Sequence, residues 1–365
     1  MRVAVTGAFG MLGFHVRALL HGMQEVDEVV PLGRGDLDDA SLLASNLRGV
    51  DVVSHLAGVN RSDPDTMRRA NPWLANQLAN AVRKSDSSPH VVFSNSVHRT
   101  RDDAYGLGKR EAAQILKGLR EDGVSVTDMV LPHVFGEFGR PNYNSVVHTF
   151  AVGLMRGHKP ELNRDGRLGL LHASRAADLI WESALHRVDD EVVAAGHPMS
   201  VRDLYDALNE MHRDYHGALL AAHDDPLRLD LLNTLRSYYF PDWMPGRLVT
   251  HGDDRGVFYE AIKVPSGGQT SVSTTAPGIT RGQHWHRRKV ERFVVMRGQA
   301  RIQLRKLFDD EVIDIDVFGD EPTAVDMPTM VVHNITNTGD EELVTLFWTN
   351  DLFDPANPDT YPEAV

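Results

Sequence analysis

The chain has 365 residues, which predicts two domains because single hydrophobic cores stop growing at about 250–300 residues. A formal net charge of −13 disfavours binding to nucleic acid, which needs a basic surface, and selects no other partner. The absence of cysteine excludes disulfides, thiol catalysis and thiolate metal sites. No leader-like or membrane-spanning apolar run is present, so a cytoplasmic location without membrane insertion is expected.

The first predicted elements are an apolar strand from Val3 to Thr6 and a helix that continues through Leu20. Three glycines lie between them at three-residue spacing, namely Gly7, Gly10 and Gly13. Glycines at such a strand-to-helix turn let the backbone approach a pyrophosphate, whose charge is stabilised at the helix N-terminus. A plain tight turn is the alternative, but the position one strand into the chain favours dinucleotide binding.

The second predicted strand, residues 28–33, is followed by Arg34, where dinucleotide-binding domains usually carry an acidic residue for the ribose 2′-hydroxyl. An arginine there can pair with a 2′-phosphate, which favours NADPH over NADH, although a solvated loop arginine has the same sequence. Asp36 follows, at the place where the enzymes that this segment resembles contact the adenine. A third buried strand, residues 51–58, carries Leu56 and Ala57 near its carboxyl end, where ligands of parallel sheets bind.

A fourth predicted strand, residues 91–96, ends in Ser96, and a helix follows with Tyr105 and Lys109 near its start. Residues at i and i+4 share a helix face, so the ammonium of Lys109 is expected beside the phenol of Tyr105. We expect this charge to lower the pKa of the phenol and prepare it for proton transfer at a carbonyl or alcohol. Ser96 can hydrogen-bond the same oxygen. An exposed helix face is the alternative.

Together with the glycine turn, these residues resemble the extended short-chain dehydrogenase/reductase family. The resemblance implies a doubly wound parallel α/β sheet of the Rossmann type over residues 1–243, a nicotinamide cofactor, Tyr105 as acid or base, Lys109 as its partner and a cofactor contact, and Ser96 as the carbonyl-binding residue. Val130 and His133 depart from the arginine and asparagine that the family usually carries there. Both belong to the substrate side.

The second half of the chain contains His284-Trp-His286, followed by Glu291 five residues later and by His333. Side chains alternate along a strand, so both imidazoles of a His-x-His pair lie on one face, and Glu291 can return to that face after a short turn. Three nitrogens and one oxygen suit zinc, iron, manganese or nickel. A surface or structural His-x-His pair is the alternative.

Residues 244–365 resemble the cupin family, an antiparallel β-barrel with a metal in its mouth. The first cupin motif is matched by Gly278, His284, His286, Glu291 and Gly298, and the second by Pro328, His333 and Asn337. The second motif usually has a glycine where this chain has Met330, a departure that bears on the local turn and not on the ligand. The resemblance implies a divalent metal, with zinc expected, bound by His284, His286, Glu291 and His333.

Two further segments resemble signatures of the 3,5-epimerases of keto-sugar nucleotides, which are also cupins. They are Asp253-Asp-Arg-Gly256 and Arg281-Gly-Gln-His284. In those epimerases the histidine after Arg-Gly is the base. A histidine that binds metal has its lone pair occupied, so His284 cannot also take a proton. Either the metal polarises the ketone and another group takes the proton, or the site is a metal-free epimerase.

Over its full length the chain resembles bifunctional capsular-polysaccharide epimerase–reductases of the type that makes UDP-2-acetamido-2,6-dideoxy-L-talose. This resemblance is carried by residues 55–61, 141–146, 253–256, 277–286 and 353–361. It implies C3 epimerisation in the cupin domain, then NADPH-dependent reduction at C4 of a UDP-4-keto-6-deoxy-N-acetylhexosamine, in a homodimer. Two alternatives are a metal cupin oxygenase fused to a reductase and a non-catalytic, NADP-responsive binding module.

Overall fold

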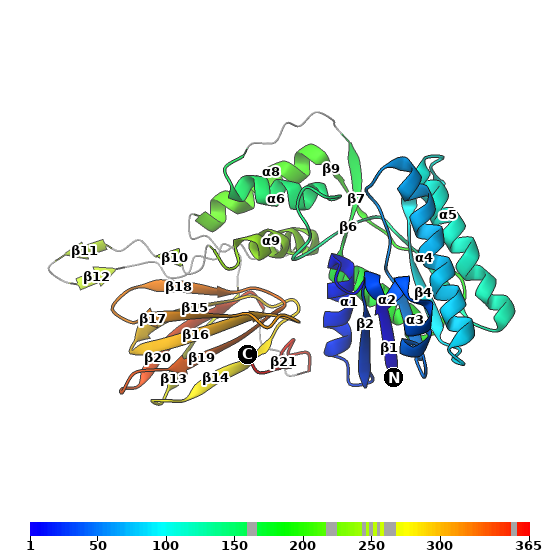
Figure 1. Ribbon diagram of the computed structural model, residues 1–365. Helices are drawn as coiled ribbons and strands as arrows, with labels where there is room; N and C mark the ends of the chain where they lie inside the picture. The colour runs from blue at the N-terminus through cyan, green and yellow to red at the C-terminus, as the bar shows by residue number, and fades with distance from the viewer. Residues whose placement is uncertain are drawn as a thin grey trace. The chain divides into compact units, whose positions relative to one another are not determined.

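The computed structural model describes residues 1–158, 166–216, 225–242, 246–247, 251–253, 256–258, 268–351 and 356–365. The chain forms two compact units (Figure 1). One consists of Met1–Thr149 and Glu161–Leu204, and the other of Phe150–Pro160 and Tyr205–Val365. The domain boundary predicted between residues 243 and 244 lies outside the described residues and stays a prediction. Asp254, Arg255 and residues 353–355, which belong to segments singled out above, also lie outside the described residues.

The first unit contains a six-stranded parallel sheet with the strand order β2-β1-β3-β4-β5-β8. The strands are β1 (Arg2–Thr6), β2 (Glu28–Leu32), β3 (Val52–His55), β4 (His90–Ser96), β5 (Val126–Leu131) and β8 (Glu191–Val193). A smaller sheet contains β6 (His133–Phe135), β7 (Arg167–His172) and β9 (His197–Ser200). Strands that follow β1 in the chain lie on both sides of it in the sheet, β2 on one side and β3 on the other. The predicted doubly wound fold is therefore confirmed.

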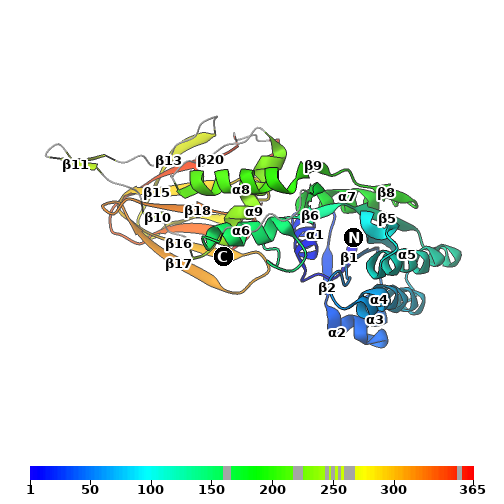
Figure 2. The same ribbon diagram turned by 90° about the horizontal axis from the view of Figure 1, so that it is seen from above.

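Helices cover both faces of this sheet because its strands bury residues on both sides. Ala4, Val53 and Phe93 pack with the helices of one face, whereas Val3 and Val92 pack with those of the other. Helices α4 and α5 lie side by side (Figure 2). The helices of this unit are α1 (Met11–His21), α2 (Arg34–Asp38), α3 (Ala40–Asn46), α4 (Pro64–Lys84), α5 (Ala104–Lys117), α7 (Ala173–Leu185), η1 (Val97–Thr100) and η2 (Gly118–Asp122), whereas α6 (Val146–Met155) is divided between the two units after Thr149.

The second unit combines helices α8 (Val201–His216, from Tyr205 onward) and α9 (Pro226–Tyr239) with antiparallel sheets. One five-stranded sheet has the order β10-β18-β15-β20-β13 and another has the order β17-β16-β19-β14-β21. The strands are β10 (Gly246–Arg247), β11 (His251–Asp253), β12 (Gly256–Phe258), β13 (Gln269–Thr275), β14 (Thr280–Trp285), β15 (Glu291–Arg297), β16 (Gln299–Lys306), β17 (Val312–Phe318), β18 (Thr323–Met327), β19 (Val331–Asn337), β20 (Leu343–Thr349) and β21 (Tyr361–Pro362).

Alternation fixes which face of each of these strands is buried. Along β16 the side chains of Ala300, Ile302 and Leu304 are buried, while Arg301 and Gln303 between them pair with aspartates of β17. The all-β cupin fold predicted for the C-terminal part of the chain is confirmed by these two antiparallel sheets. Among the helices that the structure describes, none combines the length and the apolar character that a membrane crossing requires.

Candidate functional site

The glycine turn of the first unit closes as its sequence predicts. Gly7 has a φ of +66°, and a Cβ there would lie 2.7 Å from the backbone nitrogen of Ala57. A Cβ at Gly13 would lie 2.2 Å from the carbonyl oxygen of Gly7, so neither position has room for a side chain. Gly10 has more space, because a Cβ there would lie 3.4 Å from its nearest neighbour, the carbonyl oxygen of Gly7. It precedes α1 without a side-chain cap and borders a cavity, which leaves the N-terminus of the helix available to a phosphate.

The remaining predicted cofactor residues lie at the ends of the neighbouring strands. Leu56 borders the cavity, and the backbone nitrogen of Ala57 donates a 3.2 Å hydrogen bond to Thr6 Oγ1. Arg34 is exposed at the start of α2, directly after β2. The Oδ2 atom of Asp36 accepts a 2.8 Å hydrogen bond from the backbone nitrogen of Gly33, so this carboxylate stabilises the turn that presents Arg34.

Ser96, Tyr105 and Lys109 all border the same cavity, which has a volume of about 1070 Å³. Ser96 ends β4, whereas Tyr105 and Lys109 lie on the first turns of α5. The side chain of Asp103 caps this helix by accepting a 2.8 Å hydrogen bond from the backbone nitrogen of Gly106. The structure therefore brings the three predicted catalytic side chains to one cavity.

The two glycines between Tyr105 and Lys109 have a steric role that the sequence did not reveal. A Cβ at Gly106 would lie 2.3 Å from the carbonyl oxygen of Arg101, and a Cβ at Gly108 would lie 2.9 Å from that of Met67. Larger residues at either position would push α5 away from its neighbours. The glycines thus determine how closely Tyr105 approaches the cavity.

The electrostatics of this site differ from the prediction in one respect. Burial raises the pKa of the Tyr105 phenol, and a hydrogen bond from Ser96 only partly offsets this effect. The Lys109 ammonium instead donates a 2.8 Å hydrogen bond to the carbonyl oxygen of Ser94, and burial lowers the pKa of Lys109 to about 8. The net lowering of the phenol pKa that was expected beside Lys109 is therefore absent, because burial dominates. A phenol that keeps its proton at neutral pH suits a proton donor.

Three histidines that were not predicted as site residues also border the cavity. They are His98, His133 and His148. His133 Nε2 lies 3.0 Å from Ser145 Oγ, and His148 Nε2 lies 3.1 Å from the carbonyl oxygen of Gly136. Burial lowers the pKa of His133 and of His148 to about 4, so both are neutral at physiological pH. The departure at His133 was the sequence signal that pointed to this wall of the cavity.

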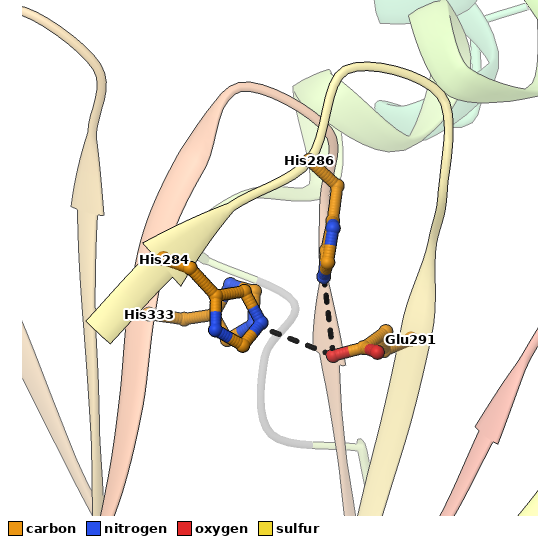
Figure 3. A group of neighbouring side chains, drawn as sticks. All are labelled: His284, His286, Glu291 and His333. Atoms are coloured by element: carbon orange, nitrogen blue, oxygen red, sulfur yellow. Dashed lines mark ion pairs between the residues drawn. The ribbon is translucent and has the colours of Figure 1, made fainter. Parts of the chain in front are cut away.

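In the second unit, the four predicted metal ligands converge (Figure 3). One ligand atom from each of His284, His286, Glu291 and His333 can be chosen so that all lie within 4.8 Å of one another. His286 Nε2 is 3.5 Å, and His333 Nε2 is 3.3 Å, from Glu291 Oε2. Trp285, between the first two histidines, turns away and stacks on Tyr361 with ring centroids 4.6 Å apart. The alternation expected for a His-x-His pair is present.

The hydrogen bonds of the imidazoles determine which nitrogens point into this cluster. His286 Nδ1 lies 2.6 Å from the carbonyl oxygen of Asp359, and His333 Nδ1 lies 3.2 Å from that of Val331. A carbonyl can only accept, so each Nδ1 carries the hydrogen, and in the neutral imidazole each Nε2 then has a lone pair. These Nε2 atoms are buried and have no hydrogen-bond partner among the described residues. Two such lone pairs beside a carboxylate fit a divalent cation.

The strand that carries His284 has an irregular backbone next to this histidine. Its register against β19 shifts between Gly282 and His284, and Gly282 and Gln283 have φ angles of +94° and +58°. A Cβ at Gly282 would lie 2.9 Å from the carbonyl oxygen of His333. Only glycine fits there, and the bulge sets the direction of the His284 side chain.

Met330 stands where the second cupin motif has glycine, and its backbone adopts a conformation that favours glycine. Its φ is +62°, in the region that favours glycine, and its side chain is fully buried. Its backbone nitrogen donates a 2.8 Å hydrogen bond to the carbonyl oxygen of His286. The turn therefore forms with a methionine, and the departure does not displace His333.

A dinucleotide-type turn, a Ser–Tyr–Lys cavity and a parallel sheet define a nicotinamide-dependent enzyme of the epimerase and reductase class. The sequence model of the NAD dependent epimerase/dehydratase family matches residues 3–196, which is more than half of the chain, and the chain belongs to this family. The model of the polysaccharide biosynthesis C-terminal domain matches residues 251–361.

More particular relatives match the whole chain. It is 33% identical to the UDP-2-acetamido-2,6-beta-L-arabino-hexul-4-ose reductase of Pseudomonas aeruginosa, over 100% of this chain and 99% of that protein. The structure of the capsular polysaccharide assembling protein CapF from Staphylococcus aureus matches with a TM-score of 0.61 and 32% identity, over 100% of both chains. A dTDP-glucose 4,6-dehydratase from Streptomyces venezuelae, with a TM-score of 0.54 and 19% identity over 67% of this chain and 98% of that chain, shares the fold alone.

Proposed function

We propose that this chain is a bifunctional sugar-nucleotide enzyme. It epimerises C3 of a UDP-4-keto-6-deoxy-N-acetylhexosamine in the cupin unit and reduces C4 with NADPH in the Rossmann unit. The product is UDP-N-acetyl-6-deoxy-L-talosamine, a precursor for capsule, O-antigen or related glycans. The observation that carries this proposal is the similarity over the whole chain to a reductase of a UDP-linked hexulose. A cytoplasmic homodimer is part of the proposal.

The reduction rests on the three groups at the cavity. The turn of Gly7, Gly10 and Gly13 would hold a nicotinamide cofactor, which would supply hydride for the ketone carbon. Tyr105, whose phenol keeps its proton, donates that proton to the ketone oxygen, so the carbonyl becomes a secondary alcohol. Ser96 Oγ accepts a 3.2 Å hydrogen bond from the backbone nitrogen of His98, and its hydroxyl hydrogen, which is bonded to Tyr105 without substrate, turns to the same ketone oxygen when the substrate binds.

Lys109 and Arg34 have separate roles in this proposal. The buried ammonium of Lys109 stabilises the phenolate that Tyr105 becomes when it gives up its proton, and it binds the cofactor. The exposed guanidinium of Arg34 pairs with the 2′-phosphate that distinguishes NADPH from NADH. The proposed preference for NADPH depends on this pair.

The epimerisation rests on the His/Glu cluster. A C4 ketone acidifies the proton on C3, and its removal leaves an enolate whose oxygen needs stabilisation. A divalent ion held by His284, His286, Glu291 and His333, with zinc the expected metal, supplies positive charge for that purpose. The lone pair of His284 is then committed to the ion, so another group moves the C3 proton. Reduction at C4 removes the ketone and fixes the new C3 configuration, which is a chemical reason to join both activities.

Isotope exchange tests the proposal directly. The purified chain is incubated in D₂O with a UDP-4-keto-6-deoxy-N-acetylhexosamine, first without and then with NADPH. We expect deuterium at C3 without NADPH and NADPH consumption after its addition. Oxygen uptake in place of C3 exchange would identify a cupin oxygenase. Binding of NADPH with neither reaction would identify a non-catalytic module.

A further inference from the structure

The last residues of the chain lie along the strand that carries the first metal ligand. Strand β21 pairs with β14, with Pro362 opposite His284 and Tyr361 opposite Trp285. The backbone nitrogen of Glu363 donates a 2.9 Å hydrogen bond to the carbonyl oxygen of Gln283. The C-terminal segment, residues 356–365, is therefore part of the wall around the His/Glu cluster. This pairing gives a structural reason for the described part of the segment 353–361, which no general folding rule predicts.

Asp359 makes the closest contacts of this segment with the cluster. Its backbone carbonyl oxygen lies 2.6 Å from His286 Nδ1. Its Oδ2 atom accepts hydrogen bonds of 2.8 Å from the backbone nitrogens of both Arg288 and Lys289. These two residues belong to the loop that joins His286 to Glu291. The main-chain carbonyl of Asp359 thus contacts His286. Its side chain bonds the loop between His286 and Glu291.

The backbone of Asp359 is held in a conformation that it would not adopt by default. Its φ is +47°, in the left-handed region, and the residue is buried. Aspartate visits this region more readily than most residues, but the conformation persists only where surrounding contacts enforce it. The two hydrogen bonds to the carboxylate supply such contacts, because a charged acceptor bonds backbone N–H groups more strongly than a neutral one.

We propose that Asp359 is a positioning residue of the metal centre, which rests on the proposed metal site. Its carboxylate fixes the C-terminal segment on the 288–289 loop, so that its carbonyl accepts the Nδ1 hydrogen of His286. That hydrogen bond fixes the tautomer and the ring orientation of His286, and Nε2 is the nitrogen that binds the ion. Partners of this kind raise metal affinity without contacting the metal.

Zinc affinity of the full-length chain, measured by competition with a chromophoric chelator, tests this role. Asp359→Gly removes the carboxylate but tolerates the positive φ, so any loss is not due to backbone strain. We expect its zinc affinity to fall by about 10–100-fold, the usual effect of losing an outer partner of a metal ligand. Asp359→Asn keeps one acceptor oxygen and should lose less. The absorption spectrum of the cobalt-loaded protein should change in Asp359→Gly, because the ligand field depends on the orientation of His286.

Glu363→Gln is the matched control. Glu363 lies in the same segment, where its carboxylate pairs with Arg305 at 2.6 Å. Its zinc affinity and cobalt spectrum should equal those of the unmodified chain. Equal affinity in Asp359→Gly, or an equal loss in Glu363→Gln, would overturn the inference. If Asp359→Gly does not fold, an Asp359→Asn protein with unchanged affinity and spectrum overturns it instead. An unmodified chain that binds no zinc, cobalt or other divalent ion would contradict the proposed metal centre itself.

Discussion

The two candidate sites of this chain differ in whether their polar side chains have hydrogen-bond partners within the described residues. At the cavity of the first unit, polar side chains are bonded to the chain itself: Lys109 donates to the carbonyl oxygen of Ser94, and Ser96 Oγ accepts from the backbone nitrogen of His98. What this site offers is space of about 1070 Å³ and a helix N-terminus. In the second unit, His286 and His333 instead direct buried Nε2 lone pairs at one point beside a carboxylate.

This difference reflects the size of the partner that each site suits. An organic cofactor with its substrate needs volume and a few donors at the rim, so its site can be stable by itself. An ion needs ligand atoms that nothing else uses, so its site keeps polar groups that are costly to bury without a partner. The two sites should therefore respond to different substitutions, and each substitution should affect one activity only.

The largest expected effect is that of Tyr105→Phe. Loss of the phenolic hydroxyl removes the proton donor, and we expect the rate of NADPH oxidation to fall by about 10²–10⁴-fold. Exchange of the C3 proton in D₂O should stay unchanged, because the cupin unit does not use Tyr105. The same protein sample thus provides its own control. If both activities disappear, or if neither changes, the division of labour between the two units is wrong.

The reciprocal substitution is His333→Ala, which removes one of the four candidate ligands. We expect zinc affinity to fall by more than about 100-fold, because losing a ligand costs more than losing its outer partner. C3 exchange should fall with it, whereas reduction of a ketone that already has the final C3 configuration should persist. Metal content of the purified protein and deuterium incorporation measure the two effects. Full C3 exchange in metal-free protein would favour the metal-free epimerase.

A smaller effect is expected from pH, through Lys109. Burial lowers its pKa to about 8, below its ordinary value, so the ammonium is present below that pH and is lost above it. The rate of ketone reduction should be level on the acidic side and about tenfold lower one unit above the pKa. Lys109→Arg keeps the charge and should lack this alkaline decline. A decline that persists in Lys109→Arg would assign the titration to another group.

Local patterns predicted much of both sites. The spacing of Gly7, Gly10 and Gly13 and the pair His284 and His286 each lie within one turn or strand, so their geometry follows from a few residues. Strand alternation and a short turn also place Glu291 on the face of that pair, whereas the place of His333 beside them was predicted through the resemblance to cupins. The structure brings these four together without any adjustment to the residues named.

What the sequence could not predict depends on distant segments. The raised pKa of Tyr105 follows from burial by strands and loops elsewhere in the chain. The partner of His286, Asp359, is 73 residues away along the chain. The spacing of such residues along the chain does not predict that they are neighbours in the fold.

The smallest expected effect concerns Met330, where two terms of opposite sign compete. Replacing it by glycine relieves a left-handed backbone, worth about 1–2 kcal/mol for an L-residue. The same change removes a fully buried methionine side chain, worth about 1.5–3 kcal/mol, and adds chain entropy to the unfolded state. We expect burial to dominate, so that Met330→Gly lowers stability by about 1 kcal/mol. Its thermal unfolding transition should shift downward by a few degrees relative to the unmodified chain. Zinc affinity should not change, because the contact of residue 330 with His286 is made by its backbone nitrogen. A gain in stability would mean that backbone strain outweighs packing at this turn, and that the glycine of the cupin motif is favoured here on energetic grounds alone.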